Sequence, residues 1–391
     1  MVKWEKVPTT VREQTLASLM ESGVQQGIFP GGVACLIQEG AVNVLTCGIL
    51  SPATLTGKPS EIFRSDTLFD LASLTKVAVT LPCILLTVQE GRLRLDDCVT
   101  TYLPELISGF DAIRKREITI HHLLTHTSGL PAWRPYFAIL RSKEEYLQAI
   151  TVEPLEREPG EAVIYSDLGF MLLGWVLERI WGERLDHIAQ SLVFDPLSMK
   201  TAWFRPRDTE EIYSASVAPT ELGNEFERGM ALTYMDKLES GMLPEGSFGL
   251  CREQLSGLNW RLEPICAEVH DANCYYGMQG ISGHAGLFST IWDLERYMKM
   301  WREQSLIMEP LCQSAVRCHA ESGTLKRGLG WELYANELYG HTGFTGTSIY
   351  RHDRMDITVI VLTNRIHPVV KEGMIEWRAA LRHALFSSHT N

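Results

Sequence analysis

The chain has 391 residues, of which 36 are Lys or Arg and 48 are Asp or Glu, so its formal net charge is -12 at pH 7. Nucleic acids and anionic membranes bind basic surfaces, and this charge therefore argues against both as partners. A hydrophobic fraction of 45% supports a substantial core, and a charged fraction of 21% gives no sign of disorder. The composition favours one or two folded domains that act on small molecules.

The N-terminus and the cysteines indicate a compartment. Residues 1–6 lead into polar helical sequence and lack the apolar core and cleavage site of a signal peptide. The nine cysteines include no C-x-x-C pair, which is typical of reduced thiols in the cytosol. The longest apolar run, 77–88, is interrupted by Pro82 and falls short of the roughly 20 residues that span a bilayer. We expect a core helix there and a cytoplasmic protein without a membrane segment, while the oligomeric state stays open.

The pattern of apolar residues predicts the elements in chain order. A helix over 10–25 precedes a hairpin of strands 33–38 and 42–47, joined by Glu39-Gly40. From 66 to 203 the pattern is helical. Helices are expected to begin near Ser73 and to cover 120–124, 143–151 and 167–181. Residues 205–275 are poorly periodic and are interpreted as an elaboration of this helical part.

Strands return in the last third of the chain. A helix after Thr290 is followed by strand-like runs and a final helix, at 330–334, 338–342, 348–350, 357–363 and 369–386. Strands at both ends with helices between them predict an α+β fold. Residues 1–65 and 280–391 would form an antiparallel sheet flanked by helices, and 66–279 an inserted, mainly helical domain.

The stretch Ser73-Leu74-Thr75-Lys76 contains the only S-x-x-K pattern in the chain. Residues three apart on a helix are neighbours, so the hydroxyl and the amine can meet. A serine becomes a strong nucleophile when a nearby base takes its proton. The alternative is a helix N-terminus with Ser73 as its cap and Lys76 in solvent. The apolar residues that follow predict a buried helix, which favours the catalytic interpretation.

Two further motifs follow in order. Tyr165-Ser166-Asp167 comes after a Pro-Gly turn and starts a helix, and His341-Thr342-Gly343 lies in a strand pair. With the Ser73 motif they resemble the three-motif set of the serine β-lactamase and penicillin-binding-protein superfamily. Five ordered segments look like its class C β-lactamase-like branch, which includes esterases, D-aminopeptidases and DD-peptidases: 69–76, 90–93, 122–130, 165–170 and 341–346.

The resemblance implies the β-lactamase/transpeptidase-like fold, with the active site in the cleft between the sheet and an all-helical domain. It makes Ser73 the nucleophile, and Lys76 with Tyr165 the proton-transfer group. The strand of His341, Thr342 and Gly343 would line the other wall. Backbone N–H groups of Ser73 and Phe344 would stabilise the oxyanion. It implies no metal and no organic cofactor.

Two residues depart from the pattern of the β-lactamases. Asp167 replaces the usual Asn; if it reaches Lys76, the lysine stays protonated and Tyr165 becomes the likelier base. Asp167 could equally serve only as a helix cap. His341 replaces the lysine of the K-T-G form, and a mostly neutral imidazole attracts a substrate carboxylate less well. We therefore expect poor turnover of β-lactams, whereas H-T-G also occurs in D-aminopeptidase and DD-peptidase relatives.

Other sequence patterns give weaker indications of a functional site. His122 and His126 are four apart, a spacing that can chelate zinc on a helix, but no third ligand is placed and structural roles are favoured. The sequences 334–336 and 234–236 fit the Y-x-N/D pattern of the middle motif without its turn-then-helix setting. We interpret all of these as structural.

The leading hypothesis is a serine hydrolase that cleaves a small ester, amide or peptide through an acyl-enzyme at Ser73. A β-lactamase or a D-Ala-D-Ala peptidase or muropeptide amidase is the nearest alternative. A non-catalytic penicillin-binding sensor is the alternative from another class. Because we expect no signal peptide, and wall-building enzymes are usually exported, the hypothesis of an esterase or amidase is favoured.

Overall fold

The computed structural model describes residues 2–51, 61–109, 111–205, 216–335 and 337–387. Its main sheet is antiparallel and runs in the order β1-β3-β2-β13-β12-β11-β10-β9-β8, with β4 paired to β3. The strands are β1 (Lys3–Trp4), β2 (Gly31–Gln38), β3 (Ala41–Ser51), β4 (Glu61–Ile62), β8 (Ala320–Ser322), β9 (Leu325–Arg327), β10 (Glu332–Leu333), β11 (Leu338–Thr342), β12 (Ser348–His352) and β13 (Ile357–Thr363).

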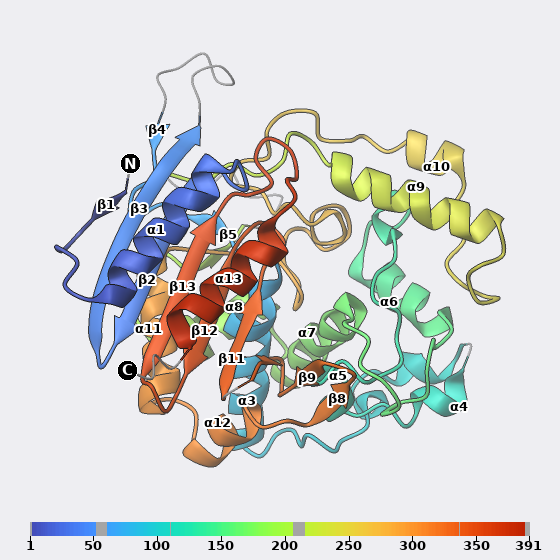
Figure 1. Cartoon of the computed structure of the whole chain (residues 1–391). Helices are drawn as coiled ribbons and strands as arrows, with labels where there is room; N and C mark the ends of the chain where they lie inside the picture. Colours follow the sequence, from blue (N-terminus) through green and yellow to red (C-terminus); the bar gives the residue numbers. More distant parts are fainter. Residues whose placement is uncertain (1, 52–60, 110, 206–215, 336, 388–391) are drawn as a thin grey trace.

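The two ends of the chain meet in the middle of this sheet. Strand β2 pairs with β13 over seven residues, from Gly32 opposite Thr363 to Gln38 opposite Ile357. Figure 1 shows the N-terminal hairpin in blue beside the C-terminal strands in red. The predicted α+β fold, with a sheet built from both termini, is confirmed.

Alternate residues of the central strands enter two different cores. In β2, Val33, Cys35 and Ile37 face one hydrophobic cluster, whereas Ala34 and Leu36 face the other. Successive side chains of a strand point to opposite faces, so a strand covered on both sides must be apolar throughout. Helices α1 (Val11–Gln25) and α13 (Met374–Phe386) cover one face, and α11 (Ile291–Glu303) packs on the other (Figure 1).

Most other helices belong to the middle of the chain. They are α3 (Leu81–Gln89), α4 (Ala112–Lys115), α5 (Ile120–Leu124), α6 (Lys143–Val152), α7 (Asp167–Trp181), α8 (Leu185–Ala189), α9 (Glu225–Glu239) and α10 (Arg252–Ser256), with α12 (Glu309–Ala315) following α11. Short 3-10 or π turns cover Ala72–Leu74, Lys76–Thr80, Val99–Thr101, Pro104–Ile107, Tyr136–Ala138, Gln190–Phe194 and Asn273–Gly277. The helical run Ala72–Gln89 is long and apolar enough to cross a membrane, but 83% of it is buried inside this fold. It forms a core helix, as its sequence predicted.

Some elements differ from the sequence-based expectation. The region predicted to be all-helical contributes β5 (Phe69–Asp70) and β6 (Trp203–Phe204), which flank β7 (Leu287–Ser289) in a second, three-stranded sheet. Strands β8 and β9 were not predicted, because they are three residues long and mostly exposed. The last helix begins at Met374 rather than near 369, after Gly373 with a φ of 88°. In the poorly periodic region, α9 is a 15-residue helix.

A buried ion pair fixes the loop after α5 to the end of α6. The Nε of Arg134 lies 2.5 Å from Oε1 of Glu153, and both side chains are at most 5% exposed. Replacing Arg134 with Met leaves this carboxylate buried without its partner, so we expect a loss of about 3 to 5 kcal/mol in the free energy of unfolding. Urea unfolding measures the loss. The matched control, Arg252→Met, breaks exposed pairs and should cost at most about 1 kcal/mol; equal losses would contradict the prediction.

Candidate active site

A cavity of about 210 Å³ opens beside Ser73. Its walls come from the turn that begins at Ala72, the start of α7, the first turns of α9 and the loops that carry Trp133, His270, Ala285 and Phe344. The lining residues are Ala72, Ser73, Trp133, Tyr165, Asp167, Phe226, Glu227, Met230, His270, Asp271, Ala285 and Phe344. Four of the residues singled out from the sequence, Ser73, Tyr165, Asp167 and Phe344, are therefore brought to one cavity.

Ser73 and Lys76 meet where the core helix begins. Ser73 lies in the 3-10 turn Ala72–Leu74 rather than at a helix N-cap, and the chain continues as the π turn Lys76–Thr80. This winding places Nζ of Lys76 2.9 Å from Oγ of Ser73. The lysine side chain is fully buried, so the alternative of a solvated lysine is wrong.

The backbone before the serine is held in a strained conformation. Ala72 has a φ of 47°, a left-handed value that costs energy for a residue with a side chain. The buried carboxylate of Asp70 accepts hydrogen bonds from the Ala72 amide at 2.8 Å and from the His270 amide at 2.7 Å. Asp70 therefore positions the nucleophile turn and ties it to the loop of His270.

Lys76 is surrounded by acceptors. Its Nζ lies 2.7 Å from Oδ1 of Asp167 and 3.2 Å from the carbonyl oxygen of His284, in addition to Ser73. An ammonium group has three hydrogens to donate, and three acceptors are present. Although burial opposes it, the charges of Asp167 and Tyr165 raise the pKa of Lys76 above its ordinary value. Lys76 is thus a cation at neutral pH. Of the two alternatives for Asp167, the structure shows the contact with Lys76, while Ser166 caps α7.

Two cations lie near the ring of Tyr165. Nζ of Lys76 is 4.9 Å from the centre of its ring, and the guanidinium of Arg327 is 5.3 Å away. His126 packs on the same ring at 4.4 Å, and its Nδ1 accepts a hydrogen bond of 3.0 Å from the Ser166 amide. Tyr165 is thus held next to Lys76, the cation that also contacts Ser73.

His341 stands near Tyr165 as a neutral ring. It is 2% exposed, its ring centre is 6.0 Å from that of Tyr165, and its Nδ1 hydrogen-bonds the carbonyl oxygen of Thr342 at 3.0 Å. Burial, together with the charges of Lys76 and Arg327, lowers its pKa well below the ordinary value. The imidazole therefore cannot supply the positive charge of the lysine that it replaces.

The loop after β11 packs directly on the nucleophile turn. Oγ1 of Thr345 donates to the carbonyl oxygen of Asp70 at 2.7 Å, and Oγ1 of Thr347 to that of Leu71 at 3.1 Å. Gly343 lies so close to Leu71 that a Cβ atom would collide with its carbonyl oxygen. The amide of Phe344 donates to no acceptor in the described part of the chain, and is thus available to a ligand.

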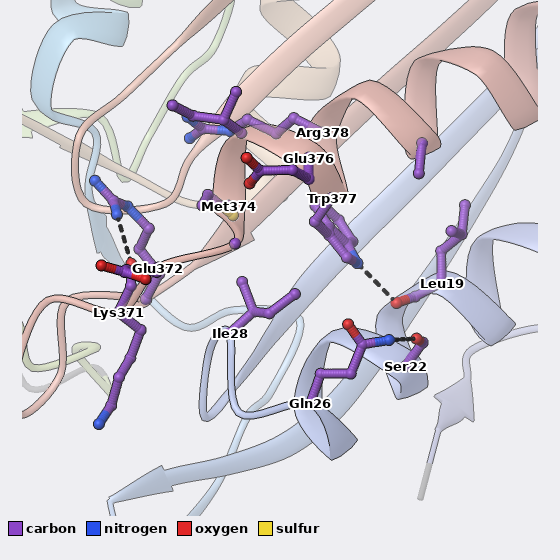
Figure 2. A pocket seen from close by; sticks show the side chains of 14 residues that line it. Leu19, Ser22, Gln26, Ile28, Lys371, Glu372, Met374, Glu376, Trp377 and Arg378 are labelled. Atoms are coloured by element: carbon purple, nitrogen blue, oxygen red, sulfur yellow. Dashed lines mark hydrogen bonds between the residues drawn. The ribbon is translucent and has the colours of Figure 1, made fainter.

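A larger groove lies elsewhere, between α1 and the start of α13 (Figure 2). It measures about 890 Å³, and Ser22, which lines it, accepts a hydrogen bond from Gln26. Two arginines reach from this groove to the loop of the active site. Arg365 donates to the carbonyl oxygen of Phe344 at 2.8 Å, and Arg378 to that of Gly343 at 2.8 Å. These two hydrogen bonds connect the wall of the groove to the loop that carries Phe344.

Several residues of the site were missed by sequence reasoning. Asp70, Arg327, Glu227 and Asp271 lie outside the three motifs and are brought in by the fold. Arg327 comes from the unpredicted strand β9, and no local signal marks it. Asp70, by contrast, stands next to the Ser73 motif, within a segment already matched to the family pattern.

The patterns interpreted as structural have ordinary partners. Nδ1 of His122 accepts from the Thr119 amide and closes a capping box, while His126 supports Tyr165. Tyr234 donates to the carbonyl oxygen of Phe248 at 2.6 Å. Tyr334 packs at 5.9 Å on Tyr350; Asn336 of the same pattern lies outside the described residues.

Comparison with known proteins defines the class. The profile of the beta-lactamase family matches residues 16–384. A protein of Escherichia coli K12 named "putative D-alanyl-D-alanine carboxypeptidase" is 29% identical over 336 residues, which cover 79% of this chain and 71% of that protein. The chain belongs to the beta-lactamase family, as the motifs indicated.

Solved structures of the same fold agree. The hydrolase EstCE1, described as having promiscuous acyltransferase activity, superposes with a TM-score of 0.72 at 19% identity, covering 96% of this chain and 98% of that one. A class C beta-lactamase gives a TM-score of 0.70 at 16% identity, covering 97% of each chain. The fold is thus that of the beta-lactamase and transpeptidase group, and the family and its relatives support a hydrolase.

Proposed function

We propose that this protein is a serine hydrolase that cleaves small esters or amides through an acyl-enzyme at Ser73. The observation that carries the proposal is the contact of 2.9 Å between the Ser73 hydroxyl and the buried Lys76 ammonium, at the edge of a cavity. A serine held beside a proton-transfer group is the arrangement from which nucleophilic catalysis starts.

The proton path follows from the charge state of Lys76. Because Lys76 is already protonated, Tyr165 serves as the base that takes the proton when Oγ of Ser73 attacks the carbonyl carbon. The oxyanion that forms is bound by the amides of Ser73 and Phe344. Tyr165 then gives the proton to the leaving oxygen or nitrogen as its bond to carbon breaks. Water then attacks the carbonyl carbon of the acyl-enzyme. Tyr165 takes the proton of the water and gives it to Oγ of Ser73 as the ester bond breaks, which releases the acid and the free serine.

The direct test is intact-protein mass spectrometry after treatment with a fluorophosphonate, on the wild type and on Ser73→Ala. We expect one adduct on the wild type and none on the variant, together with hydrolysis of p-nitrophenyl acetate that depends on Ser73. An adduct on both proteins, or on neither, would contradict the proposal. A penicillin adduct that persists without turnover would favour a sensor instead.

A peptidase or β-lactamase is the second candidate, supported by the names of the relatives. Both kinds of substrate carry a carboxylate, and His341 is held neutral by burial and by the nearby charges of Lys76 and Arg327. We therefore expect the kcat/KM for a chromogenic cephalosporin to stay far below that for a p-nitrophenyl ester. Efficient hydrolysis of the cephalosporin by the pure protein would reverse this preference.

Replacing Asp167 with Asn tests which group is the base. Asp167 raises the pKa of Lys76, so its neutral replacement lowers that pKa and lets Lys76 lose its proton at a lower pH. If Tyr165 is the base and needs the Lys76 cation, the alkaline limb of kcat/KM moves to lower pH. The measurement is a pH profile with p-nitrophenyl acetate. A shift of the acid limb alone, with more activity at pH 7, would make Lys76 the base.

A further inference from the structure

Helix α13 buries an arginine in its apolar face. The other buried side chains of this helix are hydrophobic, whereas Arg378 lies among them with 9% of its surface exposed (Figure 2). Burial lowers the pKa of Arg378, but a guanidinium group starts so high that it keeps its charge at neutral pH. A buried charge costs free energy unless acceptors replace the water that it has lost. The acceptors of Arg378 therefore indicate its role.

These acceptors are two carbonyl oxygens of the turn that follows β11. The Nη2 atom of Arg378 donates to the oxygens of Gly343 and Thr347, each at 2.8 Å. The amide of Gly343 donates to the same Thr347 oxygen at 2.8 Å, so the arginine joins the two ends of the turn. Within the described ranges, the hydrogen bonds of Arg378 go to carbonyl oxygens and not to a carboxylate. Its positive charge therefore acts directly on these peptide groups.

One of these peptide groups carries the expected oxyanion donor. The carbonyl group of Gly343 and the N–H of Phe344 belong to the same peptide, which is trans. The C=O and N–H of a trans peptide point in opposite directions. Because Arg378 holds the oxygen on the side of α13, the N–H points to the other side of the loop. On that side Gly343 packs against Leu71, and Phe344 lines the cavity beside Ser73.

The contact with Arg378 also makes this N–H a stronger donor. The C–N bond of a peptide has partial double-bond character, with negative charge on the oxygen and positive charge on the nitrogen. A cation at the oxygen stabilises that distribution of charge, and linked hydrogen bonds strengthen one another where water is excluded. A donor that is fixed and polarised beforehand needs no reorganisation when the oxyanion forms.

We propose that Arg378 is a positioning residue of the oxyanion site, which holds and polarises the peptide between Gly343 and Phe344 so that its N–H binds the oxyanion formed at Ser73. Arg378 acts through this peptide and does not touch the substrate. The inference rests on the proposed function, because it assigns a residue that supports the same reaction.

The test uses p-nitrophenyl acetate and its thiono analogue, in which sulfur replaces the carbonyl oxygen. Sulfur is a weak acceptor, so a strong oxyanion site favours the oxygen ester. The measured quantity is the oxo/thiono ratio: kcat/KM for the oxygen ester divided by kcat/KM for the thiono ester, each relative to the alkaline hydrolysis of that ester. The folded fraction of the protein cancels in this ratio. The wild type should give a ratio of about 10 or more, and a ratio close to unity would overturn the inference without any variant.

Arg378→Gln and Arg378→Lys separate the charge from the hydrogen bond. Glutamine keeps N–H donors without the charge, whereas lysine keeps the charge. In Arg378→Gln we expect kcat/KM for p-nitrophenyl acetate to fall about 10- to 100-fold and the oxo/thiono ratio to fall about fivefold, less than the loss of a whole oxyanion donor. Arg378→Lys should keep a higher ratio than Arg378→Gln. A wild-type ratio in Arg378→Gln, or the same lowered ratio in both variants, would overturn the inference.

Two other arginines provide matched controls. Arg382, one turn further along α13, donates to the hydroxyl of Tyr350 at 3.2 Å, and Arg382→Gln should leave kcat/KM and the oxo/thiono ratio within about twofold. Arg365 donates to the carbonyl oxygen of Phe344, which belongs to the next peptide along the chain. Arg365→Gln should therefore lower kcat/KM by loosening the loop but leave the ratio unchanged. If it lowered the ratio as much as Arg378→Gln, the position of the loop and not the charge at Gly343 would be decisive, which would contradict the proposal.

Failure of this inference is distinguishable from failure of the proposed function. Loss of the Ser73-dependent adduct and of p-nitrophenyl acetate hydrolysis refutes the proposed function. An intact adduct and intact hydrolysis, with an oxo/thiono ratio that does not respond to Arg378, refute only the role of Arg378.

Discussion

Replacing Lys76 with Met is expected to lower kcat/KM for p-nitrophenyl acetate by about 1,000-fold, within the range that proton-transfer groups contribute. Methionine keeps the volume of the side chain but removes the charge that contacts Ser73, Asp167 and Tyr165. Without that cation, both Ser73 and Tyr165 lose the charged group that they contact. Steady-state kinetics and the rate of fluorophosphonate labelling both measure the loss.

The chain contains a matched control for this substitution. Lys115 is also fully buried, but among the described residues its Nζ donates only to carbonyl oxygens of Ile150, Thr151 and Glu153. Burial lowers its pKa to about 8, although Asp111 and Glu153 oppose this. Lys115→Met should change the stability and leave kcat/KM within about twofold. If Lys76→Met kept more than a tenth of the wild-type activity, Lys76 would have no catalytic role.

Replacing Tyr165 with Phe should lower kcat/KM by about 100- to 10,000-fold, the usual range for the loss of a general base. The ring and its contacts with His126, Lys76 and Arg327 remain, so the thermal unfolding temperature should change little. The loss should appear in acylation, which stopped-flow kinetics with p-nitrophenyl acetate resolves.

Tyr234→Phe serves as the control for the hydroxyl. Its hydroxyl donates to the Phe248 carbonyl oxygen, and removing this bond should cost about 1 kcal/mol of stability with little effect on kcat. Comparable losses of activity in the two variants would show that Tyr165 has no special part in catalysis.

Local sequence was sufficient for much of the fold. Strands β2 and β13 consist mainly of buried apolar residues because helices cover both faces of the sheet, and such runs can be recognised in the sequence. The exposed strands β8 and β9 have no such pattern, and β5 and β6 are only two residues long. Elements of this size owe their conformation to their partners, so the sequence did not reveal them.

By itself, the sequence determined the fold class and the motif residues, because the spacing of Ser73 and Lys76 and the turn before Tyr165 are local properties of the chain. The tertiary structure decided their charge. Asp167 reaches Lys76 only when α7 packs beside the core helix, and Arg327 reaches Tyr165 from a strand about 160 residues further along. Burial and distance set a pKa, and both depend on contacts between segments far apart in the sequence.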